Sequence, residues 1–128
     1  MQHSDSIPIQ GNAFINAKEL ESGGWLLGTF LSAAEKIQRT SAIELKWGVH
    51  KKGEKRNSVG RSSLNTMAVL VNGKFKLWFP THQIDIILAN QGDYVIYELD
   101  NEHSWEALED SIVITVRWPE NKNAKQED

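Results

Sequence analysis

Short runs of aliphatic, aromatic and β-branched residues follow one another along most of this chain, and turn residues separate them. The gaps between the runs are too short for long helices, so neighbouring runs are expected to form antiparallel strands. This pattern is typical of an all-β sandwich or barrel. The runs are GWLLGTFL (24–31), AIELKWGVH (42–50), NTMAVLV (65–71), KFKLWF (74–79), IDIILA (84–89), DYVIYEL (93–99), SWEAL (104–108) and SIVITVRW (111–118).

Three segments depart from the strand pattern. NAKELES (16–22) predicts one or two N-terminal helical turns, with Asn16 as the N-cap and Gly23 and Gly24 as the stop. SAAEKIQRTS (32–41) is compatible with a helix and equally with a long hairpin connection. Residues 120–128 are polar, and we expect them to be a disordered tail. We therefore expect a single domain over residues 1–119.

Composition and charge argue against several classes of function. The net charge is −3 and the basic residues are scattered, apart from KKGEKR (51–56), which disfavours nucleic acid as a partner. The chain has no cysteine, so disulfides and thiolate metal sites are excluded. No apolar run approaches the ~20 residues that span a bilayer, and MQHSDSIPIQ has no secretory pattern. We expect a cytoplasmic protein without a membrane partner.

Asn72 and Gly73 lie between two runs of alternating apolar residues and predict a hairpin with a type I′ turn. In that register Leu70 pairs with Phe75, and the residues that share their face are suited to a barrel interior. This predicted interior face carries Thr66, Ala68, Leu70, Phe75, Leu77 and Phe79.

The opposite face of the predicted hairpin carries Met67, Val69, Val71 and Trp78 beside two lysines. A face of this mixed character is expected to be half covered, either by a second sheet or by a second subunit. Because β-barrel domains of this size often associate, we expect a homodimer.

The spacing of one glycine and one histidine resembles a motif of the cupin family, small jelly-roll barrels built as a double-stranded β-helix. The second family motif, G-x5-P-x-G-x2-H-x3-N, begins here at Gly92 and places His103 at the histidine. Glu98, Asp100 and Ala107 stand at its proline, glycine and asparagine. The resemblance covers about residues 43–118 and implies a cupin-like barrel with minor N-terminal helical turns.

The first family motif, G-x5-H-x-H-x(3,4)-E-x6-G, matches in spacing only. It begins at Gly53 and ends at Gly73, with Val59 and Arg61 at the two histidines and Thr66 at the glutamate. The resemblance thus implies that the usual metal ligands of this motif are replaced.

A rearranged metal site is one reading of the remaining ligand-type residues. His50 and Glu54 have a spacing that resembles part of the first motif, and with His103 they would form a set of two histidines and one carboxylate for a divalent transition metal. In the alternative reading no metal is bound. His50 then hydrogen-bonds locally, Glu54 is a solvated turn charge, and His103 is a polar anchor in the pocket.

Arg61 offers a second kind of chemistry. If it points inward like the histidine it replaces, its guanidinium requires a carboxylate or phosphate, from the protein or from a ligand. The alternative places Arg61 in solvent. Trp105 shares the strand parity of His103, and together with Tyr94 it is expected to form an aromatic wall, which is typical of small-molecule sites.

Three functions therefore stay open. The first is a module that binds a small polar or anionic molecule, with His103, Arg61 and His50 as anchors. The second is a metal-dependent enzyme of the oxygenase or isomerase class that uses the rearranged metal set. The third is a non-catalytic assembly protein that associates through the face of Met67, Val69 and Trp78.

Overall fold

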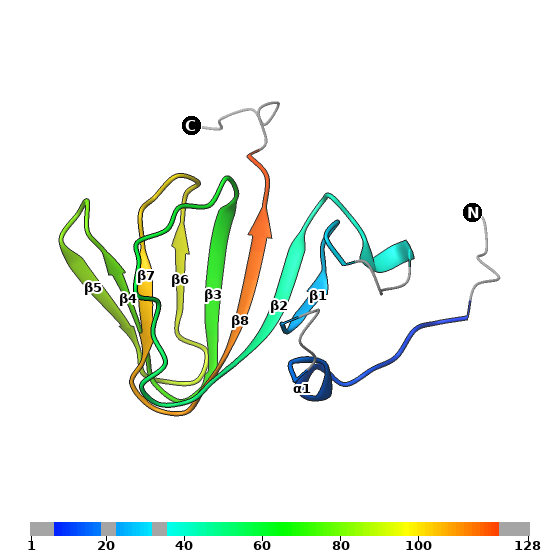
Figure 1. The fold of residues 1–128 in the computed structure, drawn as a ribbon, viewed down its shortest axis with the longest axis horizontal. Helices are drawn as coiled ribbons and strands as arrows, with labels where there is room; N and C mark the ends of the chain where they lie inside the picture. The colour runs from blue at the N-terminus through cyan, green and yellow to red at the C-terminus, as the bar shows by residue number, and fades with distance from the viewer. Residues whose placement is uncertain (1–6, 19–22, 32–35, 121–128) are drawn as a thin grey trace.

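The structure, a computed structural model, describes residues 7–18, 23–31 and 36–120. Each predicted strand run contains a strand (Figure 1). Helix α1 (Ala13–Asn16) and a 3-10 turn (Lys36–Gln38) accompany the strands. The strands are β1 (Trp25–Leu27), β2 (Glu44–His50), β3 (Asn65–Asn72), β4 (Phe75–Phe79), β5 (Ile84–Leu88), β6 (Tyr94–Tyr97), β7 (Ser104–Ala107) and β8 (Ser111–Trp118).

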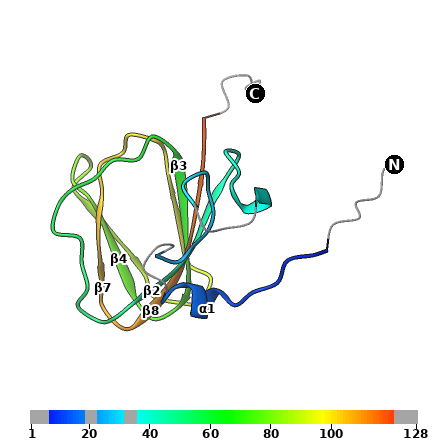
Figure 2. The same cartoon turned by 45° about the vertical axis from the view of Figure 1, so that its right-hand side comes forward.

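The strands form two antiparallel sheets that face each other (Figure 2). One sheet has five strands in the order β1-β2-β8-β3-β6, and the other has three in the order β5-β4-β7. Strands that are distant in the sequence are neighbours, since β8 lies between β2 and β3 and β7 lies beside β4. This is the all-β jelly roll that the sequence predicts. No helix in the described ranges is both long enough and apolar enough to cross a membrane.

The core lies between the two sheets and follows the period of two along each strand. The buried positions alternate along β3 and β4, and the inward side chains of β5, β6, β7 and β8 complete the cluster. The predicted interior face is confirmed, because all its members are buried. They are Thr66, Ala68, Leu70, Phe75, Leu77 and Phe79.

The predicted pairing within that set is wrong. β3 pairs with β6 and β8, whereas β4 pairs with β5 and β7, so Leu70 and Phe75 face each other from different sheets. The Asn72-Gly73 connection crosses between the sheets. Gly73 has φ +100° and Asn72 does not have the positive φ that a type I′ turn requires. The predicted set of interior residues is nevertheless correct, because the alternation along each strand decides which side chains share a face, whichever strand is its neighbour.

The crossing also separates the outer residues that the sequence placed on one face. Met67 and Val69 are half-buried on the outside of the five-stranded sheet, and Trp78 is half-buried on the outside of the three-stranded sheet. An assembly face that contains all three residues is therefore contradicted.

Asn16 is the last residue of α1 and not the predicted N-cap, and residues 19–22 of the predicted helical turns lie outside the described residues. α1 is capped by Asn12, whose side chain accepts a hydrogen bond from the Ile15 N–H at 3.1 Å. Asn12 and Asn16 are equally good N-cap residues by type, and tertiary contacts decide between them. Residues 19–22, 32–35 and 121–128, which include most of the predicted tail, lie outside the described residues.

Candidate functional site

A cavity of about 170 Å³ lies between the two sheets. Its walls combine cationic side chains with rings, and no Asp or Glu lines it in the described part of the chain. The cations are Lys46, Arg56 and Arg117, and the rings are those of Trp25, His50, Phe75, Tyr97, His103 and Trp105. The inward positions of the strands that flank it supply most of these side chains.

A larger hollow of about 350 Å³ lies outside the three-stranded sheet, beside Trp78. Charges of both signs line it, and Lys76 and Glu106 pair across it at 3.8 Å. Opposite charges that neutralise each other leave little net attraction for a charged ligand. The inner cavity, where the cations are not matched by lining carboxylates, is the stronger candidate.

Strand β2 supplies polar side chains to the inside of the molecule and apolar ones to the outside. Lys46 and His50 line the cavity, whereas Val49 is exposed on the opposite face. β8 pairs with β2 so that Lys46 is opposite Thr115 and Glu44 is opposite Arg117. The two central strands therefore bring their polar positions together at one side of the cavity.

Arg117 and Lys46 share Trp25 as a neighbour. The guanidinium carbon of Arg117 lies 4.3 Å from the centre of the Trp25 ring, and Lys46 Nζ lies 5.7 Å from it. Arg117 also forms an ion pair of 2.7 Å with Glu44. Burial lowers the pKa of the Lys46 ammonium, and the positive charge of Arg117 lowers it further.

Arg56 reaches the cavity from the segment between β2 and β3. Its backbone N–H donates to the Trp105 carbonyl at 3.0 Å, and bridges from Lys55 to Glu106 and from Gly60 to His103 hold this segment against β7. The Arg56 guanidinium lies over Gly60, where a Cβ atom would overlap it. Within the described residues Arg56 forms no ion pair with a carboxylate.

His103 is buried, and its Nδ1 lies 3.0 Å from the backbone oxygen of Asn101. Its ring packs against that of Tyr97 with centroids 4.7 Å apart. Burial lowers the pKa of His103, the Asn101 hydrogen bond acts in the opposite direction, and the charges of Arg56 and Arg117 lower it further.

His50 lies among aromatic rings, with its ring centroid 4.6 Å from that of Trp105 and 5.2 Å from that of Phe75. Its Nδ1 is 3.5 Å from a carboxylate oxygen of Glu54. Burial and the charge of Lys46 lower the pKa of His50, and Glu54 opposes this shift.

Solved structures with the same arrangement of strands include three from bacteria. A cupin superfamily protein from Desulfitobacterium hafniense DCB-2 superposes with a TM-score of 0.58 at 13% identity, over 72% of this chain and 87% of that one. KdgF from Halomonas sp. superposes with a TM-score of 0.55 at 20% identity, over 66% of this chain and 74% of its own. An RmlC-like cupin protein from Desulfovibrio desulfuricans has a TM-score of 0.54 at 16% identity, over 63% and 76%.

This chain has the cupin fold. The resemblance seen in the sequence is thereby confirmed for the fold. No family model and no curated protein matches the chain. At these identities the likeness to the solved structures concerns the barrel alone, so the chemistry of the cavity has to be argued from this chain's own side chains.

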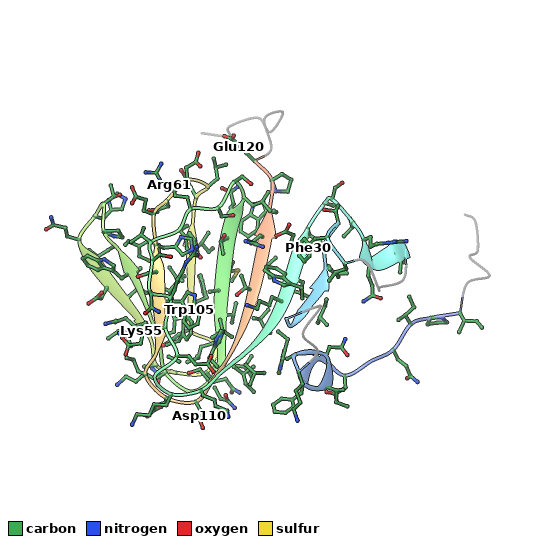
Figure 3. The ribbon with its side chains drawn as sticks, viewed as in Figure 1. Phe30, Lys55, Arg61, Trp105, Asp110 and Glu120 are labelled. Carbon is green, nitrogen blue, oxygen red and sulfur yellow. The ribbon has the colours of Figure 1, made fainter. Side chains whose placement is uncertain are left out.

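Three of the residues predicted for the pocket line the cupin cavity, namely His50, His103 and Trp105. Trp105 lies between the sheets, whereas Arg61 lies at the rim (Figure 3). The prediction that Arg61 points inward is wrong. Its side chain is 62% exposed and forms an ion pair of 2.7 Å with Glu102, because the bridge between Gly60 and His103 leaves the next residue outside the barrel.

Tyr94 does not form the predicted wall, since it is 59% exposed on the outside of β6. Val95 and Tyr97 are the inward residues of that strand, and Tyr97 takes the expected place in the cavity. The alternation along β6 places Tyr94 and Tyr97 on opposite faces, and Tyr97 is on the face that packs on the core.

The predicted metal set is not assembled. His50 and Glu54 form a pair, but no group of three His, Cys, Asp or Glu side chains suited to a metal ion occurs in the described ranges. The Glu54 side chain is 48% exposed in a turn, and His103 packs instead against Tyr97. This donor set does not fit a two-histidine, one-carboxylate centre.

Sequence reasoning missed the cations of the cavity. Lys46 and Arg117 lie on strand faces that alternate polar with apolar residues, which normally indicates a solvent-facing side. Arg56 belongs to a basic run that reads as a solvated turn. The sequence did contain one signal for the cations on β2 and β8. The opposite face of the same strands is continuously apolar.

Proposed function

We propose that this cupin binds a small anionic molecule in the cavity between its sheets. The observation that carries the proposal is the lining of the cavity by Lys46, Arg56 and Arg117 with no lining carboxylate in the described part of the chain. The proposal retains the predicted ligand class and replaces the predicted anchor Arg61 with Arg56.

The charges of these residues favour an anion in the cavity. Glu44 offsets the charge of Arg117, whereas Arg56 has no such partner among the described residues. Arg117 Nε is buried and has no hydrogen-bond partner in that part of the chain. Because the neighbouring charge of Arg117 lowers the pKa of Lys46, a bound anion would relieve this repulsion.

The size of the cavity limits the ligand. Pockets that hold drug-sized molecules occupy roughly 300–1,000 Å³, and this cavity has about 170 Å³. That is room for roughly six groups the size of a water molecule. Among anions of this size we propose a small carboxylic acid, with an acid group near the guanidinium groups and its carbon skeleton against the rings.

Arg56→Gln tests the proposal against a matched control, Arg61→Gln. Both remove a guanidinium near the same bridge, but only Arg56 lines the cavity. Lactate, propionate and acetate are titrated while tryptophan fluorescence and the melting temperature are followed, since Trp25 and Trp105 lie in the cavity wall. We expect binding to the wild type, a loss of at least about tenfold in Arg56→Gln, and no change in Arg61→Gln. Equal affinities of the two variants would contradict the assignment.

A second observation favours self-association through the outside of the five-stranded sheet. Two apolar rows cross β6, β3, β8 and β2 there, and the strands carry no charged side chain in either row. The rows are Tyr94, Val69, Ile114 and Trp47, and Ile96, Met67, Val116 and Leu45. We propose that a second copy of the chain covers this face as a homodimer.

The charge of the chain is compatible with a second copy as the partner. Each copy carries a net charge of −3, and contact through rows without charge keeps like charges apart. Apolar contiguous faces are also typical of protein interfaces. Ile96 and Ile87 are 55% and 47% exposed on the outsides of opposite sheets. Ile96→Glu should convert a dimer to a monomer in light scattering, and Ile87→Glu should not; a monomeric wild type would refute the dimer.

A further inference from the structure

We infer that the cavity selects hydroxy acids over the corresponding oxo acids, because His103 Nε2 presents a hydrogen-bond acceptor to the ligand. This inference rests on the proposed anion-binding function and names a second ligand group that strengthens binding. The acid group would lie near Arg56 and Arg117, and the hydroxyl on the adjacent carbon would donate to His103.

The hydrogen bond at Nδ1 decides the tautomer of His103. Nδ1 lies 3.0 Å from the backbone oxygen of Asn101. A carbonyl oxygen can only accept, so Nδ1 must carry the hydrogen. In the neutral ring the other nitrogen, Nε2, then has a lone pair and no hydrogen.

The backbone holds the ring in this orientation. The His103 N–H donates to the Gly60 oxygen at 3.0 Å, and the Gly60 N–H donates to the His103 oxygen at 2.9 Å. The ring packs against Tyr97 on one side and has Phe79 at a centroid distance of 6.5 Å. A ring flip would bring the carbon Cδ2 to the Asn101 oxygen in place of Nδ1 and lose this hydrogen bond, so the surroundings favour one arrangement.

The charges that face His103 favour its neutral form. Arg56 and Arg117 approach it from the 51–64 segment and from β8, while no carboxylate lines the cavity among the described residues. The burial of the ring acts in the same direction and lowers its pKa. His103 is therefore a neutral acceptor at neutral pH.

Nε2 is free to meet a ligand. His103 lines the cavity, and no hydrogen bond links Nε2 to any residue in the ranges 7–18, 23–31 and 36–120. A ligand hydroxyl can supply the missing donor, whereas a ligand oxo group would place its lone pairs against that of Nε2. A site built around a hydrogen bond discriminates strongly against analogues that cannot make it.

Three acids with the same carbon skeleton test the inference, namely lactate, pyruvate and propionate. Each is titrated into wild type and His103→Phe, with the exposed His82→Phe as a matched control. In wild type and in His82→Phe, lactate should bind about tenfold or more tightly than pyruvate. In His103→Phe the affinities for lactate and pyruvate should become equal, while propionate binding stays the same.

The outcomes separate the two proposals. If none of the acids binds the wild type, anion binding fails and the selectivity fails with it. If all three bind equally, anion binding stands and the inference is overturned. If lactate keeps its advantage in His103→Phe, another residue selects the hydroxyl.

A second measurement does not depend on the folding of a variant. Long-range proton–nitrogen NMR spectra of the wild type report which nitrogen of His103 carries the hydrogen. We expect hydrogen on Nδ1 and none on Nε2 at neutral pH. Hydrogen on Nε2 would overturn the inference.

Discussion

The guanidinium carbon of Arg117 lies 4.3 Å from the centre of the Trp25 ring, while the same guanidinium pairs with Glu44 at 2.7 Å. One side chain of β8 thus contacts both β1 and β2 at the wall of the cavity. Trp25 lines the cavity from β1, an edge strand whose only partner in the described part of the chain is β2. The position of Arg117 in the cavity wall and the attachment of the edge strand β1 to the sheet therefore depend on each other.

Trp25→Ala should remove this attachment. We expect a loss of about 2 kcal/mol in the free energy of unfolding, from the cation–π contact and the lost packing. Hydrogen exchange in residues 24–28 should accelerate relative to β3. A loss below about 0.5 kcal/mol, with unchanged exchange, would show that Trp25 does not hold the edge strand.

Phe75→Ala should be strongly destabilising. Phe75 is buried and stacks on Trp105 with centroids 5.3 Å apart, and truncation of a buried phenylalanine costs about 3–5 kcal/mol. Phe14→Ala is the control, because Phe14 is exposed on α1 and its loss should cost below about 1 kcal/mol. Urea unfolding measures both, and similar costs would contradict the placement of Phe75 in the core.

Gly73→Ala should destabilise the chain more than Gly53→Ala. Both glycines have positive φ, +100° and +91°, so both substitutions carry backbone strain of about 1 kcal/mol. A Cβ at Gly53 meets open space, whereas one at Gly73 would overlap Asp110 and Ser111. We expect an additional cost of about 1–3 kcal/mol at Gly73. Equal melting temperatures of the two variants would contradict the close approach at the sheet crossing.

The two cavity histidines should make stability fall in mild acid. Burial lowers the pKa of His50 and His103 in the folded state below the unfolded value of 6.5. Below pH 6.5 the unfolded chain therefore binds more protons than the folded one, and stability decreases as the pH falls towards the folded pKa.

Urea midpoints between pH 7.5 and pH 5.5 check this dependence, with His103→Asn and the exposed His82→Asn compared to wild type. His103→Asn should weaken the fall in stability, and His82→Asn should leave it unchanged. A wild-type midpoint that does not move over this range would refute the burial of the two rings in their neutral form.

Much of the fold was predictable because local patterns carry it. Each predicted run contains a strand, and every residue predicted for the interior face of β3 and β4 is buried. A period of two specifies which side chains share a face without reference to a partner strand. The spacing from Gly92 to His103 likewise indicated the cupin barrel and placed one histidine in the cavity.

The site was less predictable, since strands can be polar on the inside. On β2, Lys46 and His50 face the cavity while Leu45, Trp47 and Val49 face outward. Alternation alone cannot say which of two faces is the interior. The usual assumption that polar side chains meet solvent fails where a cavity provides the polar surroundings.

The sequence by itself determined the strands, the alternation and the core positions of β3 and β4, because these depend on neighbouring residues. The tertiary structure decided which strands pair, and hence that Asn72-Gly73 crosses between sheets. It also decided that Arg56, and not Arg61, joins Lys46 and Arg117 at the cavity. These outcomes depend on contacts between segments that are distant in the sequence. Such contacts form only when the two sheets pack together around a common interior.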